Sequence, residues 1–135
     1  MPDKISFSKT FQALERAISI TQKRHALITS NISNIDTSGY KPKDVDFNAA
    51  LERALTSEHG VDLVQTNPSH IALEMSGAAE VETIEETSGW NGYNWVNIDK
   101  EMTRLSENNL IYRTSVEILL KKIAILKEVI REGGR

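Results

Sequence analysis

The feature that most constrains the fold is a pair of long apolar stripes, one at each end of the chain. In residues 7–35 the stripe positions are separated alternately by four and three residues. The same alternation runs through residues 98–130, and neither stretch contains a proline or a glycine. An apolar repeat of this period is typical of the seam of a coiled coil. The sequence therefore predicts two helices, roughly 43 and 50 Å long.

Most apolar members of the stripes are the candidate seam residues, which would pair the helices within a subunit and in an assembly. They are Phe11, Leu14, Ile18, Ile28, Ile32 and Ile35 in the first stripe, and Met102, Leu105, Tyr112, Val116, Leu119, Ile123, Leu126 and Ile130 in the second. Thr21, His25 and Asn109 are polar stripe positions, and such residues can fix the register of a seam. The simpler interpretation of His25 is a place at the wet edge of the seam.

Two helices of similar length at opposite ends of a chain are most economically paired when the chain folds back. The predicted fold class is therefore mainly α, with the helices paired as an antiparallel-type coiled-coil hairpin and a small irregular middle segment between them. We expect one structural unit, with the N-terminal helix in residues 1–36, the middle segment in residues 37–96 and the C-terminal helix in residues 97–135.

Further apolar residues lie beside the stripes. They are Ala13, Ala17, Ile20 and Leu27 in the first helix, and Ile111, Ile118, Leu120 and Ile125 in the last. Because a lone pair of helices buries only one face of each, these residues would be left in water. The sequence therefore predicts that other chains cover them, as in an oligomer.

The middle segment shows weaker patterns. Residues 46–60 are predicted to form a short helix that ends at Gly60. Residues 61–64 and 70–75 alternate apolar and polar side chains as short strands do, and residues 78–89 are expected to form a loop. Three aromatic residues surround the Asn91-Gly92 turn, and we interpret them as pinning a loop on a small core. Asp99 or Asn97 is expected to cap the last helix.

Composition and charge exclude some classes of function. The net charge is −3, with mildly basic ends around an acidic middle, which argues against nucleic-acid binding. There is no cysteine, which excludes disulfides and thiolate chemistry. The first residues show no apolar core of a signal peptide, and no apolar run is long enough to insert into a membrane. We therefore expect any export from the cytoplasm to use another route.

The stretch NISNIDTSGYKP, residues 31–42, has the composition of a metal loop or a catalytic turn. Numbered from Asn34, it resembles the start of a calcium-binding loop, but the twelfth position, where a glutamate ligand belongs, is Val45. Ser38 has no histidine nearby in sequence to activate it. The sequence therefore predicts no catalytic residue, no metal site and no cofactor.

Each residue of this stretch also fits a structural interpretation, in which the first helix ends and a tight turn directs the chain away from it. Asn31 and Asn34 lie where the first stripe ends, and asparagine near a helix end can bond free carbonyls. Gly39 permits the positive φ of a tight reversal. Tyr40 is expected to anchor the emerging chain against the helices.

On these residues the chain resembles the flagellar rod, hook and axial protein family, whose N-terminal signature runs Asn-x-x-Asn-x-x-Thr-Pro-Gly-Tyr. The matching positions are Asn31, Asn34, Thr37, Gly39 and Tyr40, while Ser38 replaces the usual proline. The continuation KPKDVDFNAAL, the stretch TNPSHI and residues 91–119 are also similar to this family. The short length favours the short members of the proximal rod over the hook and distal-rod members, which carry large middle domains.

The resemblance implies a structural subunit of the proximal rod of the bacterial flagellar basal body, in the periplasm. It implies a homo-oligomer within a helical assembly, with other rod proteins and membrane-ring or adaptor proteins as neighbours. It also implies export through the flagellar type III apparatus without a cleaved signal peptide. The alternative is a binding module, either an autonomous helical-hairpin adaptor or an export chaperone.

Overall fold

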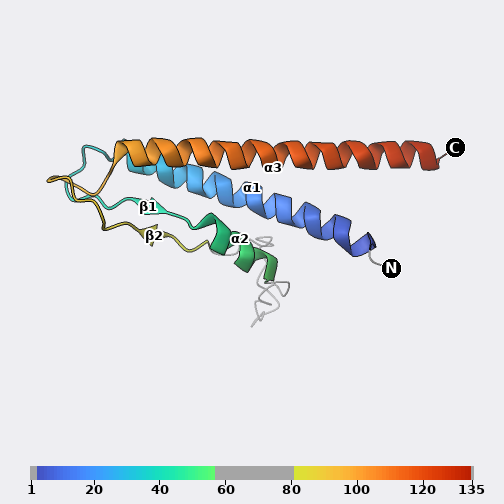
Figure 1. The fold of residues 1–135 in the computed structure, drawn as a ribbon, viewed down its shortest axis with the longest axis horizontal. Coiled ribbons are helices and arrows are strands. Elements are labelled where there is room, and N and C mark those ends of the chain that lie inside the picture. Colours follow the sequence, from blue (N-terminus) through green and yellow to red (C-terminus); the bar gives the residue numbers. More distant parts are fainter. Residues whose placement is uncertain (1–2, 57–80, 135) are drawn as a thin grey trace, which may run out of the picture.

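The computed structural model describes residues 3–56 and 81–134, and side chains from residue 7 onward. Its elements follow the order α1 (Asp3–Ser33), β1 (Lys43–Asp44), α2 (Phe47–Thr56), β2 (Ile84–Glu85) and α3 (Ile98–Gly133). The two long helices lie side by side, and both chain ends lie at the same end of the elongated molecule (Figure 1). The prediction of a mainly α hairpin with a small middle segment is confirmed.

Three contacts establish that α1 and α3 are antiparallel. Near the closed end of the hairpin, the Asn31 amide donates to the Glu101 carboxylate. Further along, the Asn108 amide donates to the Thr21 carbonyl oxygen, and the Lys122 ammonium lies 4.8 Å from the centre of the Phe7 ring. From one contact to the next, the residue number falls in α1 while it rises in α3, so the two helices run in opposite directions. Beyond Lys122, α3 continues for about one-third of its length, past the start of α1 (Figure 1).

The buried positions of α3 are polar. They are Glu101, Asn108 and Ser115, and they lie seven residues apart, so they share one line along the helix. This line lies one residue before the predicted seam positions Met102, Asn109 and Val116. The fully buried positions of α3 are therefore polar, whereas the apolar seam residues Leu105, Val116, Leu119 and Ile123 are only half-buried.

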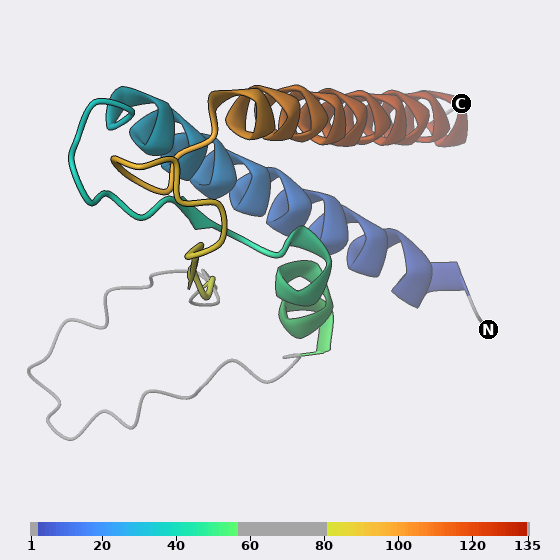
Figure 2. The ribbon, with the colours of Figure 1, turned by 60° about the vertical axis from the view of Figure 1, so that its left-hand side comes forward.

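The middle segment covers the other side of α1. Helix α2 packs on α1, and β1 pairs with β2 in an antiparallel register that sets Lys43 opposite Glu85 and Asp44 opposite Ile84. Figure 2 shows α2 against α1, on the side turned away from α3, whereas Asp44 of β1 also reaches Arg104 of α3. The buried apolar side chains of the described residues are Ala17, Ile20, Ile28, Val45, Ala54 and Val96. Ala17 and Ile20, which we expected neighbouring chains to cover, are thus buried within this chain.

The predicted elements of the middle segment have different outcomes. The short helix expected within residues 46–60 is present as α2. Asn97 is the N-cap of α3, and its side chain accepts a hydrogen bond from the Lys100 backbone N–H. The stretch expected as a loop, residues 78–89, contains β2 because Ile84 and Glu85 find partners in β1. The strands expected at residues 61–64 and 70–75 lie outside the described residues.

Candidate functional site

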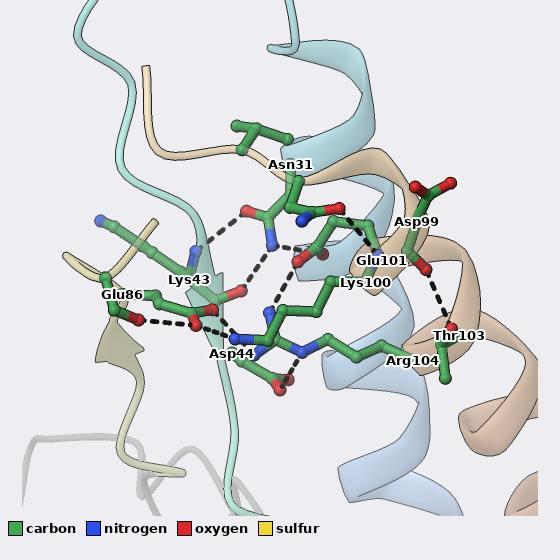
Figure 3. A network of polar contacts seen from close by, with 12 residues as sticks. Asn31, Lys43, Asp44, Glu86, Asp99, Lys100, Glu101, Thr103 and Arg104 are labelled. Carbon is green, nitrogen blue, oxygen red and sulfur yellow. Dashed lines mark hydrogen bonds and ion pairs between the residues drawn. The ribbon is translucent and has the colours of Figure 1, made fainter. Parts of the chain in front are cut away.

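Asn31 joins the two long helices and β1 at the closed end of the hairpin. Its side chain is fully buried. Its Oδ1 accepts from the Lys43 backbone N–H at 2.9 Å and from the Tyr40 hydroxyl at 3.2 Å. Its Nδ2 donates to the Lys43 carbonyl oxygen and to Glu101 Oε2, both at 2.8 Å (Figure 3). The amide thus pairs with Lys43 as a neighbouring strand would, and all of its hydrogen-bonding capacity is used.

A group of six charged residues is linked to this amide through Glu101, and we call it the junction cluster: Arg24, Asp44, Glu86, Lys100, Glu101 and Arg104. The Arg24 guanidinium forms a bidentate pair with the Asp44 carboxylate, with hydrogen bonds of 2.8 and 2.9 Å. Arg104 binds Glu101 at 2.6 Å, Glu86 at 2.8 Å and Asp44 at 3.3 Å (Figure 3). Lys100 also pairs with Glu86. Three positive and three negative groups therefore balance one another.

The electrostatics of the junction cluster favour the charged forms. Burial acts to raise the pKa of Asp44, but the hydrogen bonds from Arg24 and the Val45 backbone N–H, with the nearby guanidinium charges, hold that pKa below its ordinary value. Burial likewise acts to raise the pKa of Glu86, and its bonds to Lys100 and Arg104 outweigh that effect and lower it. The hydrogen bond to Asp44 raises the pKa of Arg24. The cluster therefore acts as an ionic clamp at neutral pH.

We expect the stability of the hairpin to fall in acid, because a carboxylate with a lowered native pKa loses its stabilising contribution on protonation. The ordinary pKa values are 3.8 for Asp44 and 4.5 for Glu86. Their contribution is fully present above these values, and it is lost as the pH falls through the lowered native pKa values. Urea unfolding followed by circular dichroism from neutral pH to about pH 3 measures this effect.

The matched control for this acid effect is Asp44→Asn. This variant should be less stable at neutral pH and should show a shallower loss in acid, because one of the titrating groups is gone. An identical pH profile for the two proteins would contradict a role of the clamp in acid stability.

The remaining residues of the family motif form a tight turn after α1. The Asn34 amide donates to the Ser30 carbonyl oxygen, and its Oδ1 accepts from the Thr37 hydroxyl at 3.0 Å. Gly39 has φ +70°, a conformation that strains residues with a side chain. Ser38 is exposed at the outer edge of the turn. These residues direct the chain from the end of α1 into β1.

A second turn, from Asn91 to Asn94, packs against the turn of the family motif in residues 34–40, which we call the motif turn. The buried Asn94 amide donates to the Ile35 carbonyl oxygen at 2.6 Å. The Tyr93 hydroxyl donates to the Asp36 carbonyl oxygen, and the Tyr93 carbonyl oxygen accepts from the Gly39 N–H. Tyr93 and Asn94 therefore hold the motif turn through polar contacts, although the Trp90 and Tyr93 side chains are about half exposed.

The candidate seam residues fall into two groups in the structure. Ile28 is buried, and Leu14, Ile18, Ile32, Ile35, Leu105, Val116, Leu119 and Ile123 are half-buried. Phe11, Met102, Tyr112, Leu126 and Ile130 are exposed, with Ile130 reaching 72%. The exposed group is not used to pair α1 with α3, so its role in a wider assembly stays a prediction.

Sequence reasoning did not identify the junction cluster. The Glu101–Arg104 pair has the i, i+3 spacing of a helical ion pair and is visible in the sequence. Arg24, Asp44 and Glu86 come from three other parts of the chain, and no local pattern connects them with this pair. Asn31 appeared only as a motif residue, and its burial became clear only in the fold.

The chemistry of the site is that of a structural joint. Every cluster residue is paired with an opposite charge, and Asn31 is fully bonded, so no activated nucleophile or base is present among them. Within residues 3–56 and 81–134, no three His, Cys, Asp or Glu side chains gather as a metal site would need. None of the helices in that part of the chain is long and apolar enough to span a membrane.

Comparison with known proteins identifies relatives along nearly the whole chain. A family profile described as "Flagella basal body rod protein" matches residues 11–41, which include Arg24, Asn31 and the motif turn. The flagellar basal body rod protein FlgB of Bacillus subtilis is 37% identical, over 94% of this chain and 97% of that protein. FlgB of Aeromonas hydrophila is 33% identical over 94% and 96%, and FlgB of Escherichia coli is 29% identical over 99% and 100%.

Proposed function

The chain belongs to the family of the flagellar basal body rod protein FlgB, structural subunits of the rod, and on that premise we propose that it assembles through the exposed apolar side chains of α3. The assembly is a helical part of the proximal rod, which transmits torque. The main support for this proposal is the number of large apolar side chains of α3 that are exposed to solvent.

The exposed residues extend over most of α3. They are Ile98, Met102, Leu110, Tyr112, Ile118, Leu120, Ile125, Leu126, Val129 and Ile130. Leu120 and Val129 are 59% and 60% exposed, and burying the exposed part of such a side chain is worth about 1–2 kcal/mol. A single helix that exposes so many apolar residues is characteristic of a surface that binds another protein.

The hairpin itself is held differently. Its contact line uses Asn31, Glu101, Asn108 and the junction cluster, which are polar or charged. Polar contacts help to specify the pairing of α1 with α3, and the exposed apolar residues of α3 remain available for neighbouring chains. Contacts between copies that do not close into a ring generate a helical filament, as a rod requires.

We also propose the finer details of this role, which the family membership supports. The subunit is synthesised in the cytoplasm, exported by the flagellar type III apparatus and built into the rod in the periplasm. Its neighbours are other rod proteins and the membrane-ring or adaptor proteins, and it has no catalytic activity. The fully paired junction cluster supports this last point, because its groups are committed to one another.

Amide hydrogen exchange tests this proposal on the purified chain alone and after addition of the other proximal-rod proteins. We expect residues 20–33 and 98–112 to be protected in the isolated chain, because the junction cluster and the Asn31 contacts hold them. Residues 117–133 should exchange rapidly alone and become protected in the mixture.

The same experiment separates the rod subunit from the alternative of an autonomous adaptor or export chaperone. A protein of that class would show equal protection along α3 with and without rod proteins and would stay monodisperse as its concentration rises. Unchanged exchange in residues 117–133 after the rod proteins have been added would reject the assembly proposal.

A further inference from the structure

Asn91 is followed by Gly92, and this pair of residues has a reactivity of its own. In a flexible chain the Gly92 backbone nitrogen attacks Asn91 Cγ. The new N–Cγ bond closes a five-membered succinimide, the Cγ–Nδ2 bond breaks, and ammonia leaves with the Gly92 proton. Water then opens the ring and leaves aspartate or isoaspartate at position 91. Glycine favours the attack because it has no Cβ beside the attacking nitrogen.

In the folded turn, hydrogen bonds hold both the oxygen and the nitrogen of the Asn91 side-chain amide. Its Oδ1 accepts from the backbone N–H of Tyr93 at 2.9 Å and of Asn94 at 2.8 Å. Its Nδ2, the group that must leave, donates to Asn94 Oδ1 at 3.0 Å and to the Val96 carbonyl oxygen at 3.2 Å. The Asn91 backbone N–H also bonds the Asn94 carbonyl oxygen. Ring closure would require these contacts to open.

The product would be incompatible with the same turn. A carboxylate at position 91 keeps two acceptor oxygens and has no proton at neutral pH. One of these oxygens would face Asn94 Oδ1 and the Val96 carbonyl oxygen, which are both acceptors. Because the Asn94 amide holds the Ile35 carbonyl oxygen at the end of α1, the disturbance would reach the motif turn.

We propose that Asn91 is a spontaneous deamidation site that reacts in the unfolded chain and is protected in the folded turn. A chain that stays unfolded then becomes chemically altered at the turn that closes its hairpin. This reactivity depends on the Asn91-Gly92 pair and on the contacts within residues 91–96, and not on the role in the rod.

The test follows deamidation in the full-length chain at neutral pH, in buffer and in urea, by peptide mass spectrometry. We expect the altered Asn91 peptide to accumulate at least about tenfold faster in urea, because the folded chain reacts only through local opening. Asn48, an exposed residue followed by alanine, is the internal control and should change little in either condition. Equal rates at Asn91 in buffer and in urea would overturn the proposal.

The consequence for the fold is tested with Asn91→Asp, which contains one of the two products. It should unfold at a lower urea concentration than Asn48→Asp, which adds the same charge at an exposed site. If the two variants unfold at the same urea concentration, deamidation does not damage the turn, and that part of the proposal fails.

Discussion

Replacing Asn31 with leucine is expected to destabilise the closed end of the hairpin by on the order of 3 kcal/mol. The two side chains are similar in size, so the change removes hydrogen bonds without opening a large cavity. It leaves Glu101 Oε2 and both backbone groups of Lys43 without the partner that the amide supplies. Each buried group left unsatisfied costs about 1–3 kcal/mol. Urea unfolding of the purified variant measures the loss.

Asn34→Leu is the matched control for this experiment. It makes the same chemical change one helical turn further along, but the hydrogen bonds of Asn34 are exposed to water. Its cost should be at most about 1 kcal/mol, in the range of a helix-end contact. Equal losses in the two variants would show that Asn31 is only another helix-end residue and has no special part in joining the helices.

The second large effect is expected from the double change Leu120→Asp and Val129→Asp. Both side chains are mostly exposed in the single chain, so the variant should unfold at nearly the same urea concentration as the original. In the rod, each change removes the burial of the exposed part of the side chain, about 1–2 kcal/mol, so the two together weaken each contact at least about thirtyfold. A strain that carries only this variant should form no rods in electron micrographs and should not swim.

Thr114→Asp serves as the control, because it adds the same carboxylate at an exposed polar position of α3. This variant should build rods and support swimming. If the double variant also builds rods in normal number, α3 does not assemble through its apolar residues, and another surface of the subunit must be sought.

The seam shows which features of the fold can be predicted from sequence patterns. The stripe period correctly indicated two long helices in one hairpin, because helix formation depends on spacing along the chain. It did not identify the fully buried positions of α3, because an apolar stripe leaves polar residues out. Glu101 and Asn108 are buried because their polar groups find partners in α1, whereas the seam residues Leu105 and Val116 are half-buried.

In the candidate site, too, some features can be recognised in the sequence and others only in the folded structure. Asn31, Asn34, Thr37, Gly39 and Tyr40 are recognisable from their spacing along the chain. That the Asn31 amide pairs with Lys43 as a strand would, and that it touches Glu101, depends on how β1 and α3 meet. No local pattern encodes a contact between residues 70 positions apart.

The sequence by itself thus determined the two helices, the glycine-containing turn between α1 and β1 and the kinship with rod proteins, because these depend on order and spacing within short stretches. Only the tertiary structure decided which side chains hold the hairpin and which remain exposed on α3. Burial and charge pairing depend on segments distant in sequence, and the junction cluster comes from four of them. The fully buried residues of α3 are therefore polar, and ten large apolar residues of the same helix remain exposed.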